Sequence, residues 1–126
     1  MVGSTKTIQK QVTTEMTALA VGSGDLEVLA TPSMIAMMEQ AAADLVRESL
    51  SEGQSSVGTK LAVEHTSASP VGETITACAT VHSMIGRRIE LTVEASDSKG
   101  VIGKGLHSRV VVEREGFMAK AQEKLG

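Results

Sequence analysis

The chain has 126 residues, a formal net charge of −3 and a hydrophobic content of 41%. This length and ordinary composition predict a single domain over residues 1–126 and exclude a disordered chain. The acidic balance and the single aromatic residue, Phe117, argue against a nucleic-acid-binding protein, which needs basic patches and stacking side chains.

The first thirty residues predict one strand followed by irregular structure. Residues 5–14 are β-branched and polar, which is typical of a strand. Residues 15–20 could form a short helical turn. The stretch 21–30 contains two glycines and predicts a loop, with a possible short strand at 26–30.

A long helix is expected to begin at Thr31. The Thr31 hydroxyl can cap the first turn as the N-cap residue, and Pro32 is already set to a helical backbone angle. We expect the helix to continue to about Leu50 and to end before Gly53.

The second half of the chain changes to the two-residue period of strands. Four strands are predicted at 60–67, 74–81, 88–95 and 101–115, with a short helical tail at 117–124. Short turns between them make neighbours antiparallel, and only the helix 31–50 can cover the apolar face of their sheet. This order predicts an α+β hot-dog fold, with a long central helix wrapped by an antiparallel β-sheet.

Glu39 is a carboxylate in the middle of the apolar stretch of the predicted helix. It shares a helix face with Ile35 and Ala43, since residues four apart lie together. A carboxylate in such surroundings must be protonated, paired or hydrogen-bonded, and it could serve as a general acid or base. Alternatively, Glu39 faces a solvent gap or pairs with a basic residue across a subunit interface.

The histidines allow several interpretations. His65 lies on the apolar side of the predicted strand 60–67, where a histidine is more often a core residue than a catalyst. His107 and Arg109 share one face of the strand 101–115 and could bind an anion, although a solvated edge is the favoured interpretation. In the same strand, the glycines of GKG at 103–105 predict close approach of another backbone or a bulge.

No sequence feature indicates secretion or membrane insertion. Residues 1–12 lack the apolar core of a signal peptide, and no apolar run is long enough to span a membrane. Cys78 is the single cysteine, so it forms no intrachain disulfide, and no Cys/His spacing fits a zinc site. It alternates with threonines on the predicted outer face of the sheet, where we expect it to be structural. We therefore expect a cytoplasmic protein without a metal or a membrane partner.

Five motifs together resemble a known family. Thr31 leads Glu39 by eight positions within TPSMIAMMEQAA, and Gly58 leads His65 by seven within VGTKLAVEHTSASPVG. GRR follows at 86–88 and GKGLHSR at 103–109, and the tail reads EGFMAKAQEKLG. From Thr31 to its end, the chain resembles the fluoroacetyl-CoA thioesterase group of single hot-dog thioesterases.

The resemblance implies a homodimer with acyl-CoA sites at the subunit interface. A tetramer is the alternative to the dimer, and we expect no cofactor beyond the CoA of the substrate. It also implies a catalytic set of Thr31, Glu39 and His65. Gly58 is expected to offer its backbone N–H near the thioester oxygen. Arg109 is expected to help bind the substrate or to hold the site together.

Thioester hydrolysis needs a nucleophile or activated water, a group that handles protons, and donors aimed at the developing oxyanion. Glu39 could attack directly or act as a base on water. His65 could donate to the carbonyl or protonate the leaving thiolate, and Thr31 could orient Glu39 or the acyl group.

The expected substrate differs from that of the family, whose aromatic lid comes from the N-terminal region. Residues 1–30 contain no aromatic residue. We therefore expect a short- or medium-chain acyl-CoA thioesterase rather than one selective for a fluorinated acyl group. The alternatives are a non-catalytic acyl-CoA-binding hot-dog protein and, more weakly, a hydratase-like hot-dog protein.

Overall fold

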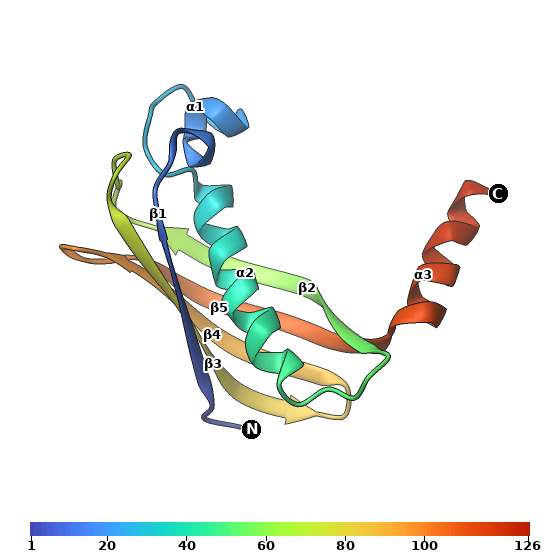
Figure 1. The fold of residues 1–126 in the computed structure, drawn as a ribbon. Coiled ribbons are helices and arrows are strands. Elements are labelled where there is room, and N and C mark those ends of the chain that lie inside the picture. Colours follow the sequence, from blue (N-terminus) through green and yellow to red (C-terminus); the bar gives the residue numbers. More distant parts are fainter.

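A long helix crosses one face of a five-stranded antiparallel sheet in the computed structural model, which describes residues 1–126 (Figure 1). The elements follow in the order β1 (Thr5–Gln11), η1 (Thr14–Met16), α1 (Ala18–Val21), α2 (Thr31–Arg47), β2 (Gln54–His65), β3 (Thr74–Ile85), β4 (Arg88–Asp97), β5 (Gly100–Glu113), α3 (Arg114–Gln122) and η2 (Glu123–Leu125). This arrangement confirms the predicted α+β hot-dog fold. None of the helices is long and apolar enough to pass through a bilayer.

The strand order in the sheet is β1-β3-β4-β5-β2. The hairpins β3–β4 and β4–β5 lie where the sequence predicts them. The expectation that all consecutive strands are neighbours is wrong for β2, which pairs with β5 at the edge of the sheet rather than with β3. The connection 66–73 is longer than a tight hairpin loop and carries the chain from that edge to β3.

The start of α2 differs from the predicted N-cap. The N-cap residue is Ala30, and Thr31 is the first helical residue, with Pro32 in the first turn. The Thr31 hydroxyl therefore caps no backbone N–H of the helix and is free for another partner. The helix ends at Arg47 rather than at Leu50.

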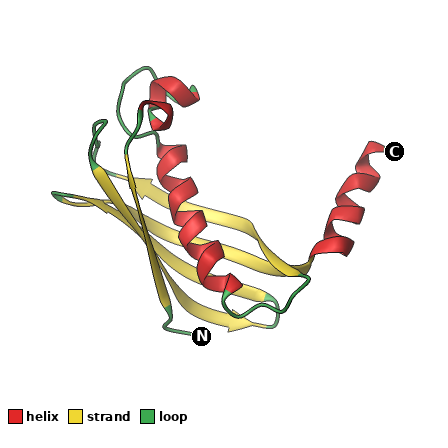
Figure 2. Ribbon diagram, in the orientation of Figure 1, coloured by secondary structure: helices red, strands yellow, loops and turns green.

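The core lies between α2 and the inner face of the sheet (Figure 2). One face of α2 is buried: Met34, Met37, Met38, Ala41, Ala42, Leu45 and Val46. It packs against alternate residues of the central strands: Ile75, Ala77, Ala79, Val81, Ile89, Leu91, Val93 and Ala95. Flexible methionine side chains thus fill the space that aromatic side chains occupy in many cores.

The two glycines of β5 allow the close packing that their position predicts. A Cβ atom on Gly103 would lie 2.7 Å from the sulfur of Met34. A Cβ atom on Gly105 would collide with the carbonyl oxygen of Ala62 and lie 2.7 Å from the Cα of Val63, both in the backbone of β2. β5 therefore needs glycine at these two positions, because the Met34 side chain and the backbone of β2 leave no room for a Cβ atom.

Gly105→Ala is expected to destabilise the fold by about 1–3 kcal/mol, because a backbone cannot move aside as a side chain does. Urea unfolding monitored by circular dichroism measures this change. The matched control is Gly116→Ala in α3, where an added Cβ meets nothing within 4 Å. That change is expected to be neutral or to stabilise the protein by up to about 1 kcal/mol. Equal unfolding midpoints for the two variants would contradict the prediction.

Two parts of the molecule lack cover from the rest of the chain. β2 contains no fully buried residue and pairs on one side only. α3 points away from the body of the protein in Figure 1 and exposes Phe117 and Met118. Both features leave apolar or hydrogen-bonding surface open for a further partner.

Candidate active site

His107 and Arg109 lie on the inner face of β5, beneath α2. Their exposed fractions are 1% and 6%. The favoured sequence interpretation, a solvated edge, is therefore wrong. β5 is an interior strand between β4 and β2, and the crossing of β2 to this position encloses the two side chains.

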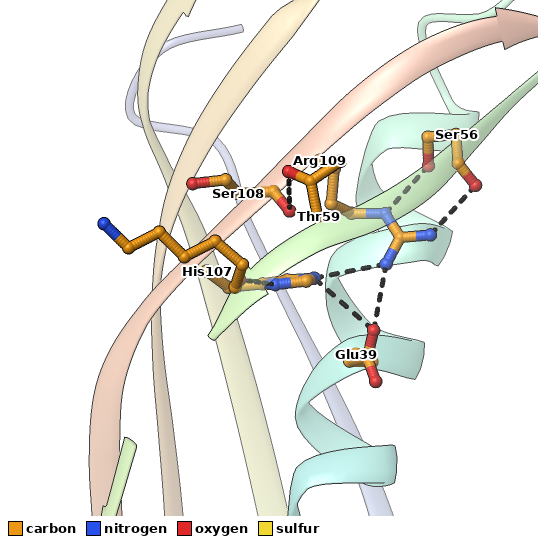
Figure 3. Close-up of polar contacts among 7 residues, drawn as sticks. Glu39, Ser56, Thr59, His107, Ser108 and Arg109 are labelled. Atoms are coloured by element: carbon orange, nitrogen blue, oxygen red, sulfur yellow. Dashed lines mark hydrogen bonds and ion pairs between the residues drawn. The ribbon is translucent and has the colours of Figure 1, made fainter. Parts of the chain in front are cut away.

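The Arg109 guanidinium is held by hydrogen bonds along its length (Figure 3). Its Nε donates to the hydroxyl of Ser56 at 2.8 Å, and its Nη2 donates to the Ser56 carbonyl at 3.0 Å. Its Nη1 lies 3.1 Å from Nε2 of His107. A planar guanidinium fixed at three nitrogens has a defined orientation.

Glu39 reaches from α2 to these two basic side chains. Its Oε2 atom lies 3.6 Å from Nη1 of Arg109 and 3.9 Å from Nε2 of His107. Glu39 thus lies beside a basic residue of its own chain, whereas one of the alternatives from the sequence was a basic partner across a subunit interface. Its side chain is 38% exposed, and both distances are longer than a hydrogen bond, so the carboxylate stays available to a further group.

Gly58 lies directly against this carboxylate. It pairs with Arg109 in the β2–β5 register, next to a bulge between Gly58 and Lys60. A Cβ atom on Gly58 would lie 2.6 Å from Oε2 of Glu39 and 3.0 Å from Cε1 of His107. We call the residues Glu39, Ser56, Gly58, His107 and Arg109 the Glu39 cluster.

Thr31 and His65 form a second group. The Thr31 Oγ1 atom lies 2.8 Å from Nδ1 of His65, which ends β2. The other ring nitrogen of His65, Nε2, is buried and has no hydrogen-bond partner. A cavity of about 340 Å³ adjoins the pair and is lined in part by Ala18, Ser23 and Ala68.

The structure therefore divides the five predicted site residues into two groups. Glu39, Gly58 and Arg109 lie together, and Thr31 contacts His65 rather than Glu39. Thr31 and Glu39 are eight residues apart on α2, a separation of about 12 Å along the helix axis. Within one chain, a ligand that contacts both groups would have to lie along α2.

Burial lowers the pKa of both basic side chains of the Glu39 cluster. Burial is the main cause that lowers the pKa of His107, and the positive charge of Arg109 acts in the same direction. The pKa of Arg109 is also lowered by burial, while Glu39 acts against that change. Because the folded protein keeps His107 neutral, it loses stability as the pH falls below about 6.5, where the unfolded chain takes up a proton first.

A further hollow lies away from both groups of candidate site residues. It has a volume of about 760 Å³ and lies on the outer face of the sheet, where Cys78, Glu94 and Lys104 are among its lining residues. Cys78 is half-buried there and contacts the hydroxyl of Thr5, which agrees with its predicted outer position. No candidate site residue lines this hollow.

Two members of the Glu39 cluster were not predicted as site residues. Ser56 precedes the predicted strand 60–67, since residues 54–59 show no alternation of apolar and polar side chains. The sequence predicts that His107 and Arg109 share a strand face, with a solvated edge favoured over an anion-binding site. The spacing of two between these basic residues was the available signal.

A helix wrapped by an antiparallel sheet, with polar side chains gathered between α2, β2 and β5, defines a hot-dog protein. A hot-dog-like protein from Thermanaerovibrio acidaminovorans has the same fold, with a TM-score of 0.90 and 28% identity over 99% of this chain and 93% of that one. A solved structure of the fluoroacetyl-CoA thioesterase FlK matches with a TM-score of 0.93 and 35% identity over 98% and 96% of the two chains.

Sequence comparison identifies the family. The model of the family "FlK: Fluoroacetyl-CoA-specific thioesterase" matches residues 12–115. The fluoroacetyl-CoA thioesterase of Streptantibioticus cattleyicolor is 41% identical over 98 residues, which are 78% of this chain and 70% of the relative. The chain belongs to the fluoroacetyl-CoA-specific thioesterase family, which confirms the resemblance found in its motifs.

Proposed function

We propose that this protein is an acyl-CoA thioesterase that hydrolyses short- or medium-chain acyl-CoA, with Thr31, Glu39 and His65 as catalytic residues. The observation that carries the proposal is the half-exposed carboxylate of Glu39, which lies beside Arg109 and against Gly58 within the fold of a thioesterase family. Arg109 and Gly58 serve to bind the substrate.

Glu39 starts the reaction in this proposal. As a base, it takes a proton from water while the water oxygen bonds to the acyl carbon. As a nucleophile, it bonds to that carbon itself, and water then hydrolyses the resulting anhydride. In both routes the carbon–sulfur bond breaks, the carboxylic acid is released, and a proton ends on the CoA thiol. The positive charge of Arg109 stabilises negative charge that develops close to Glu39.

Thr31 and His65 act as a hydrogen-bonded pair. A neutral imidazole carries one N–H, so either His65 donates to the Thr31 oxygen or the hydroxyl donates to His65. In the first case the Thr31 hydroxyl is free to donate to the substrate carbonyl. In the second case the hydrogen of His65 lies on Nε2 and can pass to the leaving thiolate, while Nδ1 takes the proton of the Thr31 hydroxyl. The proton removed from the attacking water then restores the Thr31 hydroxyl.

The cavity beside this pair supports a broad acyl specificity. Small side chains, including Ala18, Ser23 and Ala68, line it, and residues 1–30 supply no aromatic ring to close it. A variant of FlK solved in complex with acetyl-CoA matches this chain with a TM-score of 0.95 and 33% identity over 100% and 99% of the two chains. Acetyl-CoA is therefore a natural starting point for substrate tests.

A homodimer is part of the proposal. The open edge of β2 and the exposed apolar residues of α3 are surfaces that a second copy could cover. The outer face of the sheet would stay available for pairing dimers into tetramers. The proposed enzyme works in the cytoplasm and needs no cofactor beyond the CoA of its substrate.

Release of free thiol from a panel of acyl-CoA substrates tests this function. The panel runs from acetyl-CoA and fluoroacetyl-CoA through medium-chain to long-chain and aryl thioesters. We expect turnover with a preference for short or medium chains and little discrimination in favour of the fluorinated substrate. Saturable binding without turnover on any substrate would instead identify a non-catalytic acyl-CoA-binding protein.

A further inference from the structure

The two ring nitrogens of His107 have partners that fix its protonation. Nδ1 lies 2.9 Å from the carbonyl oxygen of Lys60, which can only accept, so Nδ1 carries the hydrogen. Nε2 lies 3.1 Å from Nη1 of Arg109, which can only donate, so Nε2 is an acceptor. His107 is therefore a neutral imidazole with its hydrogen on Nδ1.

This tautomer supplies the only nitrogen acceptor that contacts Arg109. Ser56 binds Nε and Nη2 along one edge of the guanidinium. The lone pair of His107 takes one hydrogen of Nη1, and the second Nη1 hydrogen is left for the side on which Glu39 lies at 3.6 Å. Figure 3 shows the imidazole and the carboxylate converging on this one nitrogen.

We propose that His107 is a positioning residue, which holds Arg109 beside Glu39 through the lone pair of Nε2. The catalytic consequence rests on the proposed function, since it assumes that Glu39 does chemistry. The geometric part, an imidazole acceptor that orients a buried guanidinium, stands by itself.

A protonated His107 would lose this role. Both ring nitrogens would then carry hydrogens. The N–H group at Nε2 of the charged imidazole would point at an N–H group of Arg109, which is also positively charged. The charges that act on His107 are those of Arg109 on its own strand, Glu39 on α2 and Glu90 on β4, and β2 contributes the Lys60 carbonyl. Burial outweighs the two carboxylates and lowers the pKa of His107, which agrees with a neutral ring.

Two substitutions test whether His107 acts as a hydrogen-bond acceptor or only fills space. His107→Leu fills the site without an acceptor, and His107→Gln offers an amide oxygen that can reach the position of Nε2. We expect kcat/KM for the best acyl-CoA substrate to fall about 10–100-fold in the leucine variant, because a displaced Arg109 loosens the geometry around Glu39. The glutamine variant should recover most of this loss. The control is His82→Leu, an exposed histidine of β3.

NMR spectroscopy tests the contact between His107 and Arg109 without a substrate. Nitrogen-15 NMR of the wild-type protein should show His107 protonated at Nδ1 alone, and still neutral at pH 6.5, where a free imidazole is about half protonated. The Nε–H signal of Arg109 should change in the leucine variant and return toward its wild-type position in the glutamine variant. Urea unfolding of each variant measures any loss of stability separately.

The outcomes distinguish this inference from the proposed function. A wild-type protein that hydrolyses no acyl-CoA overturns the proposed function, while the NMR result still decides whether His107 orients Arg109. A hydrogen on Nε2, or an Arg109 signal unchanged in folded His107→Leu, overturns the inference. If the enzyme is active, wild-type kcat/KM in folded His107→Leu, or equal losses in both variants, also overturns it. Should the leucine variant not fold, the wild-type tautomer and the glutamine variant still give the answer.

Discussion

Glu39→Gln is expected to lower kcat for acyl-CoA hydrolysis at least about 100-fold, the contribution typical of a general base. The amide has the shape of the carboxylate but neither takes a proton from water nor attacks a thioester at neutral pH. Arg109 keeps its contacts with Ser56 and His107, so the site should retain its form. Thiol release from the preferred acyl-CoA gives the rate, and circular dichroism checks the fold.

The matched control for this change is Asp44→Asn. Asp44 lies on the same helix, and its side chain is paired with Arg47 at 2.8 Å near the surface. Removing that charge should leave kcat unchanged, because surface ion pairs contribute little and Asp44 lies outside the Glu39 cluster. Wild-type kcat in Glu39→Gln with a raised KM would assign Glu39 to binding alone and remove it from the chemistry.

Local signals in the sequence predicted most of the fold. Thr31-Pro32 located the start of α2 to within one residue, because proline fixes the backbone angle of a first turn. The short connections between the predicted strands 74–81, 88–95 and 101–115 placed two hairpins, and Gly86 and Gly100 adopt positive φ angles there. The unusual position of Glu39 on an apolar helix face also marked the candidate site before its partners were known.

The partners of Glu39 depended on a long-range feature that no local pattern encodes. β2 crosses to the far edge of the sheet and pairs with β5. β5 is therefore an interior strand, and its side chains His107 and Arg109 are buried. Ser56 enters the cluster through the same crossing. Strand alternation predicts which side chains share a face, whereas it does not predict which strand lies next to them.

Thr31→Val and His65→Ala are expected to act as a coupled pair, because one hydrogen bond joins the two side chains. Each single change should lower kcat/KM, His65→Ala by about 100-fold as the loss of a proton-transfer group. The double variant should be little worse than His65→Ala alone. The resulting interaction energy should fall in the range of about 0.5–3 kcal/mol seen for residues in contact.

The kinetic losses in this double-mutant cycle can be compared only if each variant keeps its folded stability. Thr31 is the first helical residue and not the N-cap, so valine removes the hydroxyl without removing a cap. We therefore expect Thr31→Val to unfold within about 0.5 kcal/mol of the wild type, as for surface substitutions in general. The control His82→Ala removes an exposed histidine of β3 and should keep full activity. Strictly additive losses in the double variant would show that Thr31 and His65 act separately. The 2.8 Å contact between them would then be structural rather than part of the reaction.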